Sequence, residues 1–314
     1  MVNRGVSYNF THNIHPTMST PLTITLIQSQ LHWEDKEANL SMFEEKIRSV
    51  RGATEMVVLP EMFSTGFSMK PEQLAEKMDG AAVQWMERVA RENRLVVTGS
   101  LMIEEDQRYY NRLIWMLPVG QYGYYDKRHL FAYAGEDQHY TQGKKRLVTS
   151  VKKWRIHFQI CYDLRFPVWS SQQSLMSPLE RKRRVSNFDA LSMPSEPEYD
   201  VLVYVANWPE RRSLAWKTLL QARAIENQCY VVGVNRTGND GDGVYYSGDS
   251  MVIDPLGEIM YHKAHKDDIF TFTLQKDQLL EVRNKFPFWR DADHFMIFTN
   301  EEEAVDRKDG ESFL

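Results

Sequence analysis

Cysteine is scarce in this chain, which carries only Cys161 and Cys229 among its 314 residues. Two cysteines cannot form the disulfide framework of a small secreted protein, so the cytoplasm is the expected location. The sequence also lacks an apolar run of the ~18–20 residues that a membrane-spanning helix needs. Residues 1–21 have no apolar segment of a secretory signal, and we expect them to form a disordered extension before the first strand.

A strong excess of one charge is missing as well. The chain has 43 acidic and 38 basic residues, and its formal net charge is −5. This balance gives no general reason to expect nucleic acid or a membrane surface as a partner. The histidines lack the paired spacing of a metal site such as HExxH, so no metal is predicted. Hydrophobic residues make up 42% of the chain, which is typical of a globular protein with a substantial core.

Apolar, β-branched runs alternate with helical stretches along most of the chain. The strand-like runs cover residues 22–28, 55–59, 95–101, 109–117, 120–126, 154–159, 200–206, 230–235, 250–253, 258–262 and 269–274. Helical periodicity covers residues 35–51, 81–93 and 213–227. Because no linker divides this alternation, it predicts one α/β domain over residues 22–290, with one large sheet or two stacked sheets faced by helices.

Two segments depart from this pattern. Residues 171–197 are rich in serine and proline and carry the basic run 181–184. They form either a lid or partner-binding insertion or a solvated surface loop, and their composition favours the loop. Residues 291–314 form an acidic tail. The aromatic FPFW stretch before this tail is of a kind that packs on a neighbouring surface.

Cys161 stands where a predicted strand ends, in the stretch QICYDLRFP. A sharp bend there would present the thiol beside the backbone N–H of Tyr162, which suits a nucleophile with an oxyanion donor. A buried and inert cysteine is the plainer interpretation, and it is the one we adopt for Cys229. A pair between Cys161 and His157, which lies on the same strand, stays open.

A carboxylate and an ammonium also follow predicted strands. Glu61 in LPEMF lies where ligands of α/β proteins usually bind, a position suited to general acid–base work. Lys127 in YDKRHLF would lower the pKa of a neighbouring thiol and neutralise a developing oxyanion. Each residue alone is typical of an ordinary surface loop. Three such groups at the same kind of strand end, with Cys161 as the third, favour a nucleophilic hydrolase.

The segments LPEMF, YDKRHLF and ICYDLRFP together resemble the signature blocks of the nitrilase superfamily of carbon–nitrogen hydrolases. The resemblance runs from about residue 23 to residue 289, with residues 171–197 as an insert. It implies a four-layer αββα sandwich and a catalytic triad of Glu61, Lys127 and Cys161, with Glu136 as a second glutamate that positions the lysine or the substrate. It also implies no metal or organic cofactor, and a homodimer or larger assembly formed through the outer helices.

FSTGFS, YDLRFPVW and VANWP resemble the ω-amidase branch of this superfamily. That resemblance implies a thioester enzyme that uses water to release ammonia from a small α-keto acid amide, such as α-ketoglutaramate or α-ketosuccinamate. Arg165 is the nearest cation for the substrate carboxylate, although it could equally brace the bend. Trp208 either walls the pocket or packs in the core. A carbamoylase, an aliphatic amidase, a nitrilase and a catalytically idle scaffold are the alternatives.

Overall fold

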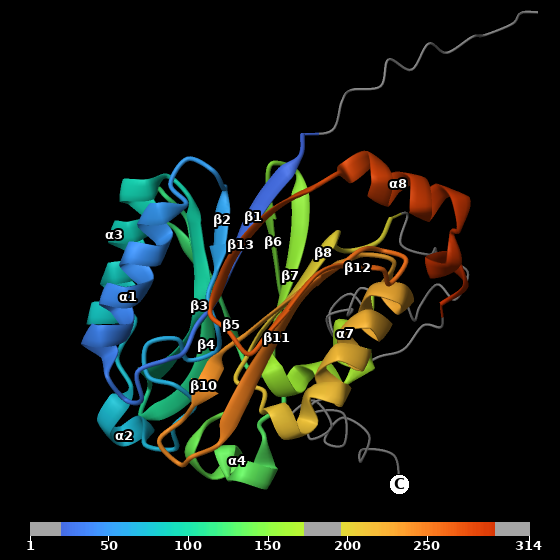
Figure 1. Cartoon of the computed structure of the whole chain (residues 1–314). Helices are drawn as coiled ribbons and strands as arrows, with labels where there is room; N and C mark the ends of the chain where they lie inside the picture. Colours follow the sequence, from blue (N-terminus) through green and yellow to red (C-terminus); the bar gives the residue numbers. More distant parts are fainter. Residues whose placement is uncertain (1–19, 173–195, 293–314) are drawn as a thin grey trace, which may run out of the picture.

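Two β-sheets pack face to face, and helices cover both outer sides (Figure 1). The computed structural model describes residues 20–172 and 196–292. On one side lie α1 (Lys36–Ser49) and α3 (Ala81–Asn93), and on the other lies α7 (Ser213–Asn227). The predicted four-layer αββα sandwich is therefore confirmed.

The first sheet has the strand order β13-β1-β2-β3-β4-β5, and the second has the order β10-β11-β9-β8-β7-β6 with β12 paired to β11. The strands are β1 (Leu22–Gln28), β2 (Met56–Val58), β3 (Val96–Glu105), β4 (Arg108–Met116), β5 (Tyr122–Asp126), β6 (Leu147–Val151), β7 (Trp154–Ile160), β8 (Val201–Ala206), β9 (Tyr230–Asn235), β10 (Thr237–Asn239), β11 (Tyr245–Ile253), β12 (Ile259–Ala264) and β13 (Asp268–Leu274). In each sheet three neighbouring strands run parallel, namely β1–β3 and β7–β9. Parallel strands end at a common edge, and their loops can gather functional side chains there.

Apolar side chains fill the space between the sheets and beneath the helices. The rings of Trp115 on β4 and Phe158 on β7 lie 5.3 Å apart and join the two sheets. Gly233 on β9 allows a close approach of α7, because a Cβ at this position would lie 2.5 Å from the Leu220 side chain. The sheets and the helices therefore share one continuous framework, which holds the strand ends in fixed positions.

The shorter helices lie in the loops and at the end of the described chain. They are α2 (Pro71–Leu74), α4 (Glu136–His139), α5 (Pro167–Ser170), α8 (Lys276–Lys285) and the 3₁₀ helices η1 (Ala132–Ala134), η2 (Cys161–Arg165), η4 (Glu210–Arg212) and η5 (Phe288–Asp291). Sequence patterns predict the long helices and most strands, but they do not predict β6, β10 or α8. No helix in residues 20–172 and 196–292 is long and apolar enough to cross a bilayer.

Three predictions concern segments that lie largely outside the described residues. These are the N-terminal extension, the 171–197 insertion and the acidic tail, of which residues 1–19, 173–195 and 293–314 are not described. The two ends of the insertion are joined, because Gln172 donates to the carbonyl of Tyr199 at 3.0 Å and accepts from its N–H at 3.1 Å. The insertion therefore begins and ends at one point of the framework.

A buried ionic cluster attaches α8 to the start of β8. The carboxylate of Asp200 accepts a hydrogen bond from Arg283 Nη1 at 3.0 Å and from the backbone N–H of Arg155 at 2.9 Å, and it also pairs with Lys276. Arg283 donates further to the carbonyls of Tyr199 and Gln228. Because Asp200 is fully buried, these contacts replace its lost hydration.

Replacing Asp200 by Asn should destabilise the protein by about 3–5 kcal/mol, because it leaves buried Arg283 without its counter-charge. Urea unfolding at pH 7 measures this loss. Arg48→Gln, which removes one partner of an exposed i,i+4 pair with Glu44, should cost less than about 1 kcal/mol. Equal losses in the two variants would contradict this assignment.

The effect of Asp200→Asn should also depend on pH. Burial alone would raise the pKa of Asp200, but its hydrogen bonds with Arg155 and Lys276 outweigh burial and lower that pKa. The carboxylate therefore stabilises the fold fully above the unfolded pKa of about 3.9, and this contribution is lost as the pH falls through the folded pKa. The difference in the free energy of unfolding between wild type and the Asp200→Asn variant should accordingly decrease as the pH falls into the acid range.

Candidate active site

Cys161 lies at a sharp bend directly after β7, as the sequence predicts. Its φ is +45°, in the left-handed region that residues with a side chain seldom adopt. The side chain is 8% exposed and lines a cavity of about 520 Å³. The bend thus directs the thiol away from the core of the sheet and towards an enclosed space that a small molecule can enter.

The carboxylate of Asp163 holds this bend. Its Oδ2 accepts from the backbone N–H of Ile160 at 3.0 Å and from the hydroxyl of Tyr125 at 2.7 Å. Its Oδ1 accepts from the backbone N–H of His129 at 2.9 Å. Asp163 is fully buried, so it links the cysteine bend rigidly to the segment that carries Lys127.

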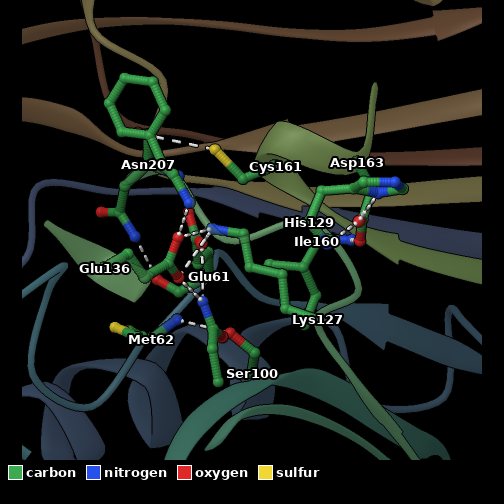
Figure 2. Close-up of polar contacts among 12 residues, drawn as sticks. Glu61, Met62, Ser100, Lys127, His129, Glu136, Ile160, Cys161, Asp163 and Asn207 are labelled. Carbon is green, nitrogen blue, oxygen red and sulfur yellow. Dashed lines mark hydrogen bonds and ion pairs between the residues drawn. The ribbon is translucent and has the colours of Figure 1, made fainter. Parts of the chain in front are cut away.

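Lys127 lies between two carboxylates (Figure 2). Its Nζ is 2.9 Å from Glu61 Oε1, and it is 2.9 Å and 2.8 Å from the two carboxylate oxygens of Glu136. None of the three side chains has measurable solvent exposure. Burial alone would lower the pKa of Lys127, but the charges of Glu136 and Glu61 outweigh it and raise that pKa, so the ammonium stays charged.

Two asparagines complete the cluster, and the sequence reasoning missed both. Asn111 on β4 donates through Nδ2 to Glu61 Oε1 at 2.8 Å and to Glu136 Oε1 at 3.2 Å. Asn207, directly after β8, donates its backbone N–H to Glu61 Oε2 at 2.7 Å. Asn207 follows a strand in the same way as Glu61 does, so its position could have been noticed. Asn111 lies within a strand and gives no such signal.

The Cys161 thiol is protonated at rest. Burial raises its pKa, the charge of Glu61 raises it further, and the opposing effect of Lys127 is smaller. Lys127 does lower the pKa of this thiol, as the sequence analysis expects, but burial and the charge of Glu61 outweigh its effect. A thiol that needs deprotonation lies next to a carboxylate, which is the arrangement of a nucleophile and its general base.

His157 does not pair with Cys161. Its Nδ1 lies 2.9 Å from the carbonyl of Leu147, and its Nε2 lies 3.1 Å from Gln159 Nε2. Burial is the main effect that lowers the pKa of His157, to about 3, so the ring is neutral. The geometry does not support a cysteine–histidine pair. Cys229 is fully buried in the core.

The other predicted site residues line the same cavity. The ring of Tyr162 packs 5.0 Å from that of Phe131, while Arg165 is exposed and its guanidinium lies 5.1 Å from the ring of Trp208. Trp208 is buried and also lines the cavity. It therefore both packs in the core and forms part of the pocket wall, the two roles that the sequence analysis considers. Among the residues that the structure describes, the Arg165 side chain has no hydrogen bond that braces the bend. Arg223 instead donates to the carbonyl of Leu164 at 2.7 Å.

No group of three or more His, Cys, Asp or Glu side chains is arranged to hold a metal ion within the described ranges. A site without metal or organic cofactor stays a prediction. The Tyr162 N–H as oxyanion donor is likewise a prediction.

A carbon–nitrogen hydrolase family model matches residues 23–174 and 187–284. Omega-amidase YafV of Escherichia coli K12 is 41% identical over 278 residues, which cover 88% of this chain and 99% of that protein. A 2-oxoglutaramate amidase of Bacillus subtilis is 27% identical over 272 residues, covering 86% and 96%. The match of the family model is interrupted within the stretch predicted to be an insertion.

Solved structures have the same fold. XC1258 of Xanthomonas campestris, described as a CN-hydrolase superfamily protein with an arsenic adduct in its active site, superposes with a TM-score of 0.82 at 38% identity. The alignment covers 89% of this chain and 100% of that one. Nit3 of Saccharomyces cerevisiae, at 23% identity over 86% of this chain and 96% of its own, has a TM-score of 0.70 and supports the fold.

The charges around the thiol lead to a prediction about its reactivity. Replacing Glu61 by Gln removes a charge that raises the pKa of Cys161, while Lys127 stays in place. The midpoint pH for alkylation of Cys161 by iodoacetamide should therefore shift downward. Mass spectrometry of the modified peptide measures this rate against pH, with Cys229 as the internal control. An unchanged or higher midpoint would refute the electrostatic assignment.

Proposed function

Because this chain belongs to the carbon–nitrogen hydrolase family, we propose that it cleaves the terminal amide of a small α-keto acid, such as α-ketoglutaramate, through a thioester on Cys161. It is an amide hydrolase that acts on carbon–nitrogen bonds other than peptide bonds. The names of the omega-amidase and 2-oxoglutaramate amidase relatives support the choice of substrate. The observation that carries the mechanism is the buried cluster of Glu61, Lys127 and Glu136 beside a protonated thiol.

In the first step Glu61 accepts the thiol proton as the sulfur of Cys161 attacks the amide carbonyl. A carbon–sulfur bond forms, and the carbonyl electron pair moves onto oxygen. Lys127 and the N–H of Tyr162 stabilise this oxyanion, and each such donor can be worth roughly 3 kcal/mol of the barrier. Water is largely excluded from the cluster, which strengthens these interactions.

The oxyanion then collapses, and Glu61 returns its proton to the departing nitrogen. The carbon–nitrogen bond breaks, ammonia leaves, and the acyl group stays on Cys161 as a thioester. Glu61 next removes a proton from water, which attacks the thioester and releases the acid, and the sulfur regains a proton. Glu136 acts as a positioning residue, since both of its oxygens hold the Lys127 ammonium.

Substrate binding involves the cavity wall. Trp208 forms part of this wall and is fixed by Asn235, whose side chain accepts from the Trp208 N–H at 2.8 Å and donates to its carbonyl at 2.9 Å. Arg165, at the exposed side of the cavity, provides a guanidinium for the substrate carboxylate. The catalytic domain comprises residues 22–290, and the enzyme works in the cytoplasm.

The helices that cover the outer face of the second sheet provide an interface for a second copy of the chain. Leu214 and Ile225 on α7 are 77% and 55% exposed, and Val168 on α5 is 48% exposed. Apolar groups of this kind on neighbouring outer helices suit a homodimer contact.

Turnover provides the direct test of the three catalytic roles. Cys161→Ala, Glu61→Gln and Lys127→Met should each reduce ammonia release from α-ketoglutaramate by roughly 10³-fold or more, because the three groups act as a unit. Cys229→Ala serves as the matched cysteine control and should keep most of the activity. Circular dichroism checks that each variant is folded. Full turnover by the Cys161→Ala protein would rule out the proposed mechanism.

The dimer is tested separately. Leu214→Glu together with Ile225→Glu should convert the assembly to monomers in light scattering, because the charges would be buried at the interface. Val119→Glu changes an equally exposed apolar residue in the β4–β5 turn and should leave the mass unchanged. A wild-type protein that is already monomeric at micromolar concentration would refute the dimer.

A further inference from the structure

Arg212 is a half-buried cation for which the described residues provide no carboxylate. It ends η4, is the N-cap residue directly before α7, and lines the cavity that contains Cys161. Its guanidinium lies 4.9 Å from the ring of Phe131, and no hydrogen bond or ion pair from its side chain to any residue in 20–172 or 196–292 occurs. An arginine removed from water normally gains such a partner, so this one is available to a ligand.

The cavity around Arg212 has an excess of positive charge. Burial lowers the pKa of Arg212, and the neighbouring charge of Arg211 lowers it further. Arg165 also lines the cavity. Three guanidinium groups therefore meet in a small volume, which favours the binding of an anion.

Acidic residues of the cavity lining do not neutralise these arginines. The oxygens of Glu34 accept from Ser68 Oγ at 2.6 Å and from Lys70 Nζ at 2.9 Å. The carboxylate of Asp240 accepts from the Tyr246 hydroxyl at 2.9 Å and from the backbone of its own turn. Glu34 is thus held by the loop of Ser68 and Lys70, and Asp240 by residues of its own turn. Asp242 also lines the cavity, but it forms no ion pair with an arginine among the described residues, so the arginine side of the cavity remains electropositive.

Arg212 is also held in a fixed relation to the reacting groups. Trp208 Nε1 donates to the carbonyl of Arg212 at 2.8 Å. The same short loop carries Asn207, whose N–H contacts Glu61. A ligand in the cavity would therefore be able to contact both the arginine and the thiol of Cys161.

We propose that Arg212 is the principal binding group for the carboxylate at the far end of the amide substrate, with Arg165 as a second contact. A guanidinium binds a carboxylate through two parallel hydrogen bonds, which fixes the direction of the substrate as well as its charge. The substrate class is accordingly the ω-amides of anionic acids, and uncharged amides bind poorly. This inference rests on the proposed function for its reaction, but it predicts anion binding independently of turnover.

The kinetic test compares α-ketoglutaramate with its uncharged methyl ester. Arg212→Gln should raise KM for the anion roughly 100-fold, whereas kcat/KM for the ester should change less than about threefold. Arg211→Gln removes the same charge one residue earlier and should raise KM for the anion less than about tenfold. An equal loss of kcat/KM for the anion and the ester in Arg212→Gln, or a larger rise of KM for the anion in Arg211→Gln than in Arg212→Gln, would overturn the assignment.

A binding test separates this inference from the proposed reaction. Calorimetry with glutarate, a stable dicarboxylate, uses the Cys161→Ala protein with and without Arg212→Gln. The second substitution should weaken binding at least tenfold, and Arg212→Lys should restore part of it. Unchanged glutarate binding would overturn the role of Arg212 even if turnover is observed. Failure of wild type to hydrolyse α-ketoglutaramate would reject the proposed function, while loss of glutarate binding would still support Arg212.

Discussion

The buried ammonium of Lys127 is the group on which the rest of the site depends. It lies between Glu61 and Glu136, and all three are shielded from solvent. Without the lysine, two carboxylates would share a site that cannot hold both charges, and one of them would take up a proton. The ammonium therefore offsets the charges of the two carboxylates, and these carboxylates in turn keep the ammonium charged.

Both sheets contribute to holding this arrangement. Glu61 and Lys127 follow strands of the first sheet, whereas Cys161 and Asn207 follow strands of the second. The left-handed backbone at Cys161 costs roughly 1–2 kcal/mol. Asp163 offsets this cost with hydrogen bonds that reach across to the lysine segment. The sandwich thus supplies a rigid frame in which an unfavourable local conformation places the sulfur at the edge of the cavity.

Most of this fold could be predicted because buried strands and amphipathic helices have clear periodicities. The helix α8 has a weak apolar stripe, and its attachment depends on the pair of Asp200 with Arg283, a long-range contact that periodicity does not reveal. Strand ends likewise indicated the positions of the charged groups and the cysteine. Asn111 reaches the cluster only through the pairing of β4 with β5, and Arg212 lies in a polar turn that resembles an ordinary helix start. The positions of Asn111 and Arg212 in the site both depend on tertiary contacts, which short sequence patterns do not encode.

The most direct test of the account is the mass of the protein during turnover. The protein is mixed with α-ketoglutaramate, quenched in acid within milliseconds to seconds, and digested for mass spectrometry. We expect an adduct on the Cys161 peptide whose mass equals that of the substrate less ammonia, and hydroxylamine should remove it as a hydroxamate. Ammonia release at the full rate without any adduct or hydroxamate, or with the acyl group on another residue, would contradict it.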